Sequence, residues 1–501
     1  MKRLLNILML ATIPAGLVFG QGSPATGPAI VTLADDLLPN TRAEQFAGAD
    51  ASCKIAAAII ALPSEGGTVD ARSLSDVGGA GLCTIDPGTK SVTILAGPYT
   101  YHITQIVLRT NFHFIGSGSG TGLGGTTRLP TLIQAMGNNS IPPIVLTTAA
   151  EGQEHVILKG FRLVGAIGNT SQNGIVVNAT GLNGGLWYSE FDDIEVANFG
   201  GIGLDIESPV GGGITQFSMF DRVRVFRVAG GGYGLVVKGW NSSLTFRNCE
   251  FDGTPQVSGG DGTTSNILID AFGGGIFPPY NIEFDLLTTQ WSPQAMRINA
   301  ADTLSISQGH FEGDYNAITL GSAASFSALG ITVHDSWFGN GTGVNGGAGS
   351  IVNNLASTPN VSMQFTNSHV YAAPDVFFKG NTGSIYQCGN TVGPEGSYIY
   401  VPCSNKNVGT IALSTSSIAP HSCDAAQTAT VSGVTTSSAL AWNFASTPIG
   451  VTGYGDNTSP FLVVTVFPTA NTVNAVVCNT SARAIKPGAI SIRVSAWSTA
   501  P

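Results

Sequence analysis

The sequence predicts an all-β protein: a right-handed parallel β-helix (a single-stranded solenoid) with an N-terminal α-helical cap and a C-terminal antiparallel β-sandwich. Only 10% of the residues are charged, whereas glycine occurs 66 times, a composition typical of strands and turns rather than of solvated helices. A strand-like pattern returns every 22 to 38 residues through the middle of the chain. Because 501 residues exceed what one compact core accommodates, these copies indicate a fold that grows along one axis.

The chain begins with a segment typical of a secretory signal peptide, residues 1–20, followed by a leader over residues 21–48. Lys2 and Arg3 precede an apolar run that ends in small residues near Gly20; the alternative is an uncleaved anchor. Cleavage would remove two of the 21 basic residues and leave 19 against 31 acidic ones, a net charge of −12. No Lys/Arg cluster supports nucleic acid as a partner. No other apolar run approaches the ~18 residues that span a bilayer, so no membrane association is expected after cleavage.

Residues 49–403 are expected to form the β-helix with its cap. Asp50 is placed to begin a helix that Pro63 ends. The apolar residues between them follow helical spacing: Ile55, Ala58, Ile59 and Leu62. Short strands separated by glycine turns are expected next, over residues 66–74, 92–103 and 106–120.

Eight copies of a six-residue template follow, beginning at residues 158, 191, 220, 246, 284, 306, 333 and 365. In each copy the first, fourth and sixth positions are expected to point inward, and the second and fifth outward. Each copy is too short to bury its own apolar face, so the copies must stack as parallel ladders with strands ~4.8 Å apart. Their variable spacing argues against a propeller, whose blades need a regular length.

The third template position turns the chain in every copy. This predicts turn geometry at Gly160, Asp193, Arg222, Asn248, Leu286, Gln308, Asp335 and Asn367. The fourth position points inward, and in one copy it is Cys249. That cysteine is expected to be a small buried hydrophobe, with a reactive thiol as the alternative.

Seven cysteines in an exported chain predict disulfide bonds. Proximity in sequence suggests three pairs and leaves Cys249 over: Cys53–Cys83, Cys388–Cys403 and Cys423–Cys478. The last pair would clip a separate antiparallel β-sandwich over residues 405–501, where strand-like runs alternate with Gly, Pro, Asn and Ser.

The N-terminal part of the chain resembles the cap and first coils of the pectate-lyase-like superfamily, and more closely its rhamnogalacturonase/epimerase-like branch. The shared pattern is a helix, Gly-Gly-Thr-Val (66–69), Gly-x-Tyr (97–99) and an apolar strand ending in Gly-x-Gly (116–118). With the coils, the resemblance covers residues 45–400. It implies the fold but no single reaction, because the family contains lyases, hydrolases, epimerases, phage tail parts and members with no known activity. It leaves the oligomeric state open between a monomer and a homotrimer.

The fifth template position forms an outward column: Arg162, Glu195, Arg224, Glu250, Thr288, His310, Trp337 and His369. Opposite charges alternate in its first half because like charges at strand spacing would repel. Such a ladder needs no ligand; alternatively, the column lines a saccharide groove. Glu195 and Glu250 would then lie two rungs apart, roughly 9.6 Å by strand spacing, near the upper end of the separation that inverting glycosidases use.

In the groove hypothesis the catalytic residues are Glu195, Arg224, Glu250 and His310. Arg224 would bind a uronate carboxylate or act as the base of a lyase, and His310 would transfer protons. The expected substrate-binding residues are Arg162, Asp192, Asp221, Trp337 and His369, with Trp337 stacked on a sugar face.

Asp192 and Asp221 are adjacent like charges in the second-position column. They could bind a calcium ion, or one of them could have a raised pKa; alternatively, both are solvated and splayed apart. The group His310, Glu312 and Asp314 is also ligand-like, although the two acids are expected to begin a turn. No other cofactor is predicted.

These features together predict an exported carbohydrate-active protein, secreted or held at the cell surface or in the periplasm. It would act on an extracellular, acidic, pectin-like polysaccharide by lyase or glycoside hydrolase chemistry. The alternative is a non-catalytic adhesion or carbohydrate-binding β-helix protein, because the catalytic signatures of the resembling family do not carry over. The sequence has no Asn-Thr-Asp, no Asp-Asp followed by Gly-His-Gly, and no Arg-x-Pro-x-x-Arg.

Overall fold

The computed structural model describes most of the chain between residues 40 and 497. The described segments are residues 40–75, 79–120, 130–136, 140–146, 151–166, 168–181, 183–209, 211–226, 232–252, 265–272, 277–290, 292–321, 329–339, 350–355, 362–371, 378–380, 384–392, 399–401, 404–405, 408–431, 434–455 and 462–497. The expected signal peptide, residues 1–20, lies outside them. No helix of these segments is long and apolar enough to cross a membrane.

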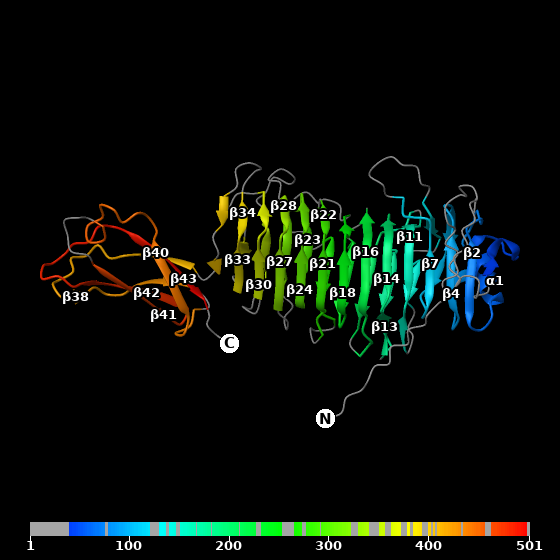
Figure 1. Ribbon diagram of the computed structural model, residues 1–501, viewed down its shortest axis with the longest axis horizontal. Helices are drawn as coiled ribbons and strands as arrows, with labels where there is room; N and C mark the ends of the chain where they lie inside the picture. Colours follow the sequence, from blue (N-terminus) through cyan, green and yellow to red (C-terminus); the bar gives the residue numbers. More distant parts are fainter. Residues whose placement is uncertain are drawn as a thin grey trace, which may run out of the picture. The chain divides into compact units, whose positions relative to one another are not determined.

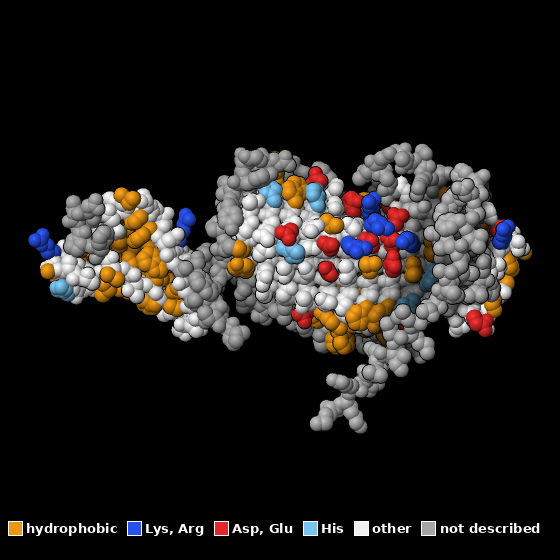
Figure 2. All heavy atoms as spheres, in the orientation of Figure 1, with side chains coloured by type: hydrophobic (Ala, Val, Ile, Leu, Met, Phe, Trp, Pro, Cys, Tyr) orange, Lys and Arg blue, Asp and Glu red, His pale blue; other side chains and the backbone are white. Residues whose placement is uncertain are grey.

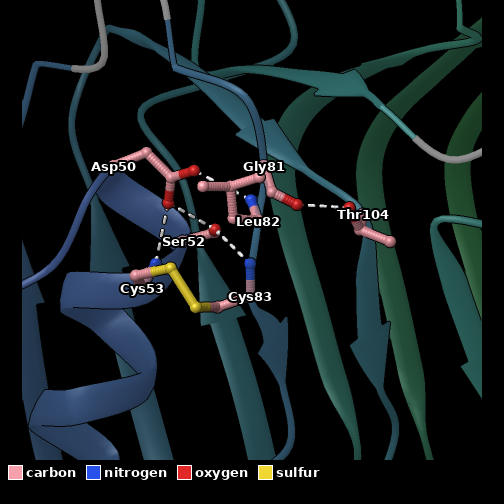
Figure 3. Close-up of a disulfide and its surroundings, with 7 residues drawn as sticks. All are labelled: Asp50, Ser52, Cys53, Gly81, Leu82, Cys83 and Thr104. Carbon is pink, nitrogen blue, oxygen red and sulfur yellow. Dashed lines mark hydrogen bonds between the residues drawn. A yellow bond between two sulfur atoms is a disulfide. The ribbon is translucent and has the colours of Figure 1, made fainter.

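The predicted cap is confirmed by α1 (Ala51–Ala61), which follows a 3₁₀ turn, η1 (Ala43–Gln45). The Asp50 carboxylate accepts a hydrogen bond from the Cys53 amide at 2.9 Å, as expected of an N-cap. The predicted disulfide between Cys53 and Cys83 joins the helix to the segment before the first strand of sheet B, and Figure 3 shows the hydrogen bonds that surround it. The cap is therefore fixed to the first coils by a covalent bond as well as by packing.

Two long sheets form the β-helix, and Figure 1 shows their strands side by side in chain order. The described strands of sheet A are β1 (Asn40–Arg42), β2 (Gly66–Ala71), β4 (Ser91–Ala96), β5 (Thr100–Ile103), β7 (Phe112–Ile115), β8 (Leu132–Ala135), β10 (Glu151–Glu154), β11 (Ile157–Val164), β13 (Asn183–Trp187), β14 (Glu190–Ala197), β16 (Gln216–Phe226), β18 (Ser242–Arg247), β19 (Glu250–Phe251), β21 (Tyr280–Asp285), β22 (Thr288–Gln290), β24 (Asp302–Ser307), β25 (His310–Glu312), β27 (Leu329–His334), β28 (Trp337–Gly339), β30 (Ser362–Thr366), β31 (His369–Val370), β33 (Ser384–Cys388), β34 (Asn390–Val392), β35 (Ile399–Val401) and β36 (Ser404–Asn405). Those of sheet B are β3 (Thr84–Ile85), β6 (Gln105–Val107), β9 (Ile144–Leu146), β12 (Ile175–Asn178), β15 (Leu204–Ser208), β17 (Leu235–Gly239), β20 (Ile267–Asp270), β23 (Gln294–Ile298), β26 (Asn316–Leu320), β29 (Val352–Asn354) and β32 (Phe378–Gly380).

Each coil adds a bent pair of segments to sheet A and one strand to sheet B. The strands of successive coils pair in parallel, as between β14 and β16 in sheet A and between β15 and β17 in sheet B. Among the described strands of sheet A, only β35 and β36 pair in an antiparallel sense, β35 with β34 and β36 with β33. The fold is therefore the predicted right-handed parallel β-helix.

The strand register confirms the alignment of the eight template copies. Phe191, Phe220, Phe246 and Phe284 pair in succession, so the copy beginning at residue 284 belongs to the repeat despite its divergent sequence. Every third-position residue has a left-handed backbone, with φ between 50° and 70°. This single residue bends sheet A in each coil, as the turn-like residue types predicted.

Aromatic side chains fill the interior of these coils. Phe191, Phe220, Phe246 and Phe284 stack with ring centroids 4.7, 4.8 and 4.9 Å apart, the spacing that parallel strands impose. Phe311 and Phe338 stack in the same way at 4.6 Å. The core is therefore continuous along the solenoid rather than centred in one place.

Cys249 confirms the prediction of a small buried hydrophobe. Its thiol is unpaired and buried among the core side chains. Burial raises the pKa of this thiol to about 12, so the reactive thiolate is not formed at neutral pH.

The C-terminal residues form two small antiparallel sheets, as predicted. One contains β37 (Val408–Ala412), β40 (Ala439–Phe444) and β43 (Ser491–Trp497), and the other β38 (Ser422–Cys423), β39 (Gln427–Thr430), β41 (Val463–Thr469) and β42 (Thr472–Asn479). The two sheets share one apolar core. The predicted disulfide between Cys423 and Cys478 joins directly paired residues of β38 and β42. Cys388 is also in a disulfide, and its expected partner, Cys403, lies outside the described residues.

Leu286 offers a test of the bend. Its backbone is left-handed, with φ of 54°, and its side chain is 42% exposed. A leucine in this conformation costs roughly 1 kcal/mol, whereas asparagine tolerates it. We therefore expect Leu286→Asn to raise the thermal unfolding midpoint. The matched control, Leu287→Asn, places an amide in the core and should lower the midpoint. A lower midpoint for Leu286→Asn would contradict the strain assigned to this bend.

Candidate active site

Charged side chains gather on the outer face of sheet A between β11 and β19. We call this group the charged ladder: Lys159, Arg162, Asp192, Glu195, Asp221, Arg222, Arg224, Arg247 and Glu250. Figure 2 shows it as the concentration of red and blue spheres over these strands. The register places all of them except Arg222 in the two predicted columns, and Arg222 lies at the bend between the columns.

Arg222 resolves the repulsion between the adjacent aspartates. Its guanidinium forms ion pairs with both Asp192 and Asp221. Lys159 also pairs with Asp192 at 2.6 Å, and Arg247 pairs with Asp221 at 2.9 Å. The two carboxylates are buried, so the expectation that they are solvated and splayed apart is wrong.

The pKa of Asp221 moves in the direction opposite to the raised value considered from the sequence. The hydrogen bonds from Arg247 hold the pKa of this carboxyl below its ordinary value of 3.8, against the effect of burial. The left-handed turn at Arg222 lets its side chain lie between the aspartates, where the sequence suggested a calcium ion. Among the described residues, no group of three or more His, Cys, Asp or Glu side chains is arranged to hold a metal.

The fifth-position column contains the predicted alternation of charges. Arg162 pairs with Glu195 at 2.9 Å, and Arg224 lies 3.8 Å from Glu250. Glu195 is only 3% exposed, which places it beneath the surface that a substrate would contact. Glu250 keeps a quarter of its side chain exposed. Of the two glutamates expected to act together, only Glu250 is therefore available to a ligand.

The charged ladder presents its cations to the solvent. The side chains of Lys159, Arg222 and Arg247 are 46–47% exposed, whereas those of their aspartate partners are 4–7% exposed. The buried acids hold the cations in place, and the cations cover the acids. A chain with a formal net charge of −10 therefore carries a local basic surface.

An acidic pair lies at the end of the charged ladder. Glu250 is followed two residues later on the same face by Asp252, and a hydrogen bond between their side chains is one of the causes that raise the pKa of Asp252. Burial raises the pKa of Asp252 to about 8, and the neighbouring charges of Glu250 and then Asp314 add to this effect. The Oδ1 atom of Asp252 is buried and accepts no hydrogen bond from the described residues. Asp252 is therefore a neutral carboxylic acid at pH 7.

Asp314 lies behind this pair and is held rigidly. It accepts hydrogen bonds from the Ser292 hydroxyl at 2.7 Å, the Ser292 amide at 2.9 Å and the Thr289 hydroxyl at 3.0 Å. Burial raises the pKa of Asp314 to about 7 despite these donors. When ionised, it adds negative potential beside Asp252 and favours the protonated form of that acid.

A histidine, a tryptophan and a further carboxylate complete the site. His310 stacks on Trp337 with ring centroids 4.4 Å apart, and its Nε2 atom lies 3.4 Å from Glu312. Glu312 belongs to β25 rather than to a turn, which corrects the expectation for this residue. His369 follows Trp337 on the next coil, as predicted.

The register sets the spacing between the carboxyl groups. Thr288 lies between Glu250 and His310 in one column. Two residues further along, Gln290 pairs with Glu312, which places Asp252 and Glu312 two coils apart. Their backbones are thus roughly 9.6 Å apart, with Gln290 of the intervening coil between them.

The structure brings together some of the predicted site residues and adds others. The predicted outward column is present, and it contains Arg162, Glu195, Arg224, Glu250, His310, Trp337 and His369. Asp192 and Asp221 lie in the other column, where they are held by ion pairs. Asp252 lay outside the six-residue template and was missed. The repeated spacing Glu-x-Asp, at 250–252 and 312–314, is the feature that could have indicated it.

No protein-family model matches the chain, and no curated protein matches it. Solved structures do resemble it. The tailspike protein of Acinetobacter phage vB_ApiP_P1 is 13% identical, with a TM-score of 0.44 over 91% of this chain and 87% of the tailspike. The tailspike of E. coli bacteriophage HK620, in complex with a pentasaccharide, is 10% identical, with a TM-score of 0.42 over 89% and 90%. The A-module of the Azotobacter vinelandii mannuronan C-5 epimerase is 15% identical, with a TM-score of 0.34 over 71% and 100%.

The likeness concerns the fold alone at these identities. The activity must therefore be argued from the site itself.

Arg222→Met tests the role of the bridging guanidinium. We expect the free energy of unfolding to fall by about 1–3 kcal/mol, because two buried carboxylates lose a partner while Lys159 and Arg247 remain. The lowered pKa of Asp221 stabilises the fold above pH 3.8, and this contribution is lost as the pH falls through the folded-state value. The deficit of the variant should therefore shrink as the pH falls below 3.8 in denaturant titrations. Arg222→Lys, which keeps a cation, is the control; equal stability of all three proteins would refute the role.

Proposed function

We propose that this protein is an exported glycoside hydrolase that acts on an acidic extracellular polysaccharide. The observation that carries the proposal is the neutral carboxylic acid Asp252, held two coils away from the exposed carboxylate Glu312. Glycosidic bonds are hydrolysed by such pairs of carboxyl groups in different protonation states.

Asp252 is the general acid in this mechanism. It donates its proton to the departing glycosidic oxygen as the bond to the anomeric carbon breaks. Glu312 is the general base, which accepts a proton from the water molecule that adds to that carbon from the opposite face. The two-coil backbone spacing of roughly 9.6 Å is closer to the ~6.5–9.5 Å between carboxyl groups in inverting enzymes than to the ~5 Å in enzymes that form a covalent intermediate, which supports the inverting route.

Glu250 keeps Asp252 protonated and is a positioning residue in this proposal. Its carboxylate is hydrogen-bonded to Asp252, so the two groups are too close to act on opposite sides of a sugar ring. Glu250 also pairs with Arg224 at 3.8 Å. This pairing places the guanidinium against a carboxylate, which speaks against Arg224 as the base of a lyase.

The exposed cations of the charged ladder indicate an acidic substrate. Arg222, Arg224 and Arg247 lie on the strands next to the acidic pair and could bind uronate carboxylates as forked donors. Trp337, with its ring stacked on His310, offers an aromatic edge at the other side of Glu312. Two of the disulfides, Cys53–Cys83 and Cys423–Cys478, support an extracellular or surface location.

A non-catalytic binding protein is the second candidate, because the exposed cations alone would hold an acidic glycan. The two are separated by incubating the purified full chain with polygalacturonate and other uronic-acid polysaccharides. New reducing ends without unsaturated products support hydrolysis. Unsaturated products would indicate a lyase, and retention of polymer without cleavage would indicate binding only.

Asp252→Asn tests the general acid. The amide cannot donate the required proton, so we expect the hydrolysis rate to fall by about 10²–10⁴-fold. In the native protein the rate should decline as the pH rises through about 8, where Asp252 ionises. Because that pKa lies above 3.8, ionisation should also destabilise the fold as the pH rises through about 8. Asp302→Asn, an exposed acid elsewhere on sheet A, is the matched control and should leave the rate unchanged.

Glu250→Gln distinguishes positioning from direct catalysis. Removing this negative charge should lower the pKa of Asp252 and move the alkaline limb of the rate profile down by roughly one pH unit. The rate at the new optimum should remain within about tenfold of the native rate. The exposed Glu283→Gln is the control for loss of a glutamate charge. Loss of activity at every pH would instead assign the direct catalytic role to Glu250.

A further inference from the structure

A second surface of sheet A carries exposed aromatic side chains. Five successive coils contribute one each at the amino-terminal margin of the sheet, and we call them the aromatic strip: His155, Tyr188, Phe217, Trp240 and Phe277. Figure 2 shows an apolar patch along this margin, well separated from the charged ladder. The strip precedes the charged ladder along each coil: in β16, Phe217 comes before both Asp221 and Arg224.

The rings of the aromatic strip are stacked in two groups. Tyr188 lies between His155 and Phe217, with centroid distances of 5.9 and 5.3 Å and interplanar angles of 22° and 10°. Trp240 stacks on Phe277 at 5.1 Å and 17°. Tyr188, Phe217 and Trp240 are 54%, 50% and 46% exposed. The stacking orders these rings without removing them from solvent.

Two residues of the aromatic strip, Tyr188 and Phe217, lie at a position where the backbone is left-handed, a conformation that costs bulky residues free energy. Tyr188 and Phe217 have φ of 50° and 52°, and the equivalent residues of other coils include Asn111 and Asn281, at 55° and 54°. Asparagine tolerates this left-handed geometry, whereas bulky residues are strained in it. Exposure and backbone geometry both disfavour tyrosine and phenylalanine here, so stability of the fold does not explain them.

One ring of the strip has an open face. Phe217 stacks on Tyr188 on one side, and no other ring contacts it among the described residues. The next coil in register places Ser243 there, followed by Asn281, whose amide donates to the Ser243 hydroxyl at 3.1 Å. An aromatic face thus adjoins uncharged hydroxyl and carboxamide groups. A pyranose ring presents complementary chemistry: a C–H face that packs on an aromatic ring and hydroxyl groups that pair with serine and asparagine.

The size of the strip argues against a protein partner. The three half-exposed rings of the strip, Tyr188, Phe217 and Trp240, offer roughly 300 Å² of surface in total. This area is well below the roughly 800 Å² per partner that a stable protein interface buries. The polar groups beside Phe217 are also uncharged, unlike those of the charged ladder. We infer that the aromatic strip is a binding site for neutral pyranose units of a glycan, separate from the acidic pair. This binding does not depend on the proposed hydrolysis.

Affinity electrophoresis of the full chain tests this inference. Native gels would contain laminarin, barley β-glucan, linear galactan or no polysaccharide, and migration would be compared between variants. We expect at least one neutral glycan to retard both the native protein and Asp252→Asn, which would lack hydrolytic activity. The double variant Tyr188→Asn/Phe217→Asn should bind about tenfold more weakly while melting at the same or a higher temperature, because asparagine relieves the backbone strain. Leu286→Asn, a left-handed exposed residue of the other bend, should bind like the native protein.

Four outcomes would overturn the inference. One is the absence of retardation by all three neutral glycans, and another is unchanged retardation of the double variant. The third is a change in sedimentation between the native protein and the double variant, which would assign the strip to contacts between copies of the chain. Loss of retardation together with a lowered melting temperature would also count against it, since the strain argument requires the opposite sign.

Discussion

The register between parallel coils is the constraint on which the rest of this structure depends. Once one coil pairs with the next, each side chain is placed ~4.8 Å from its equivalent above and below. Equivalent side chains of successive coils must therefore be compatible at this distance. For this reason phenylalanines stack inside at 4.7–4.9 Å and opposite charges alternate outside. A slip by one residue would turn the core outward, so the left-handed residue that bends each coil also protects the register.

The same constraint explains how a weakly charged chain builds a basic surface. Stacked aspartates at Asp192 and Asp221 would repel if left alone, and both are buried. Arg222 lies at the bend with a left-handed backbone, and its guanidinium lies between the two aspartates and pairs with both. The acids are covered and the cations remain partly exposed. The same ion pairs therefore remove the repulsion between the two aspartates and leave positive charge exposed to the solvent.

The acidic pair follows the opposite principle. Glu250 and Asp252 lie where the run of cations ends, and Asp314 is buried behind them. Burial and the neighbouring charge of Glu250 keep a proton on Asp252. Within a few residues of one sheet, carboxylates that are paired with cations are thus followed by Asp252, a carboxyl group that keeps its proton. Such differences are what acid–base chemistry requires.

The sequence by itself determined the solenoid, the cap and both columns, because period, turn residues and inward apolar positions are local properties that repeat. It also determined the Cys53–Cys83 and Cys423–Cys478 pairs, and the burial of Cys249. Which charges are buried and which are exposed was decided only by the tertiary structure. Glu195 and Glu250 occupy equivalent positions in sequence, yet one is covered by Arg162 and the other adjoins Asp252. The burial and protonation of a side chain depend on neighbours from other coils and on residues just beyond the repeat. The repeat pattern does not specify these neighbours.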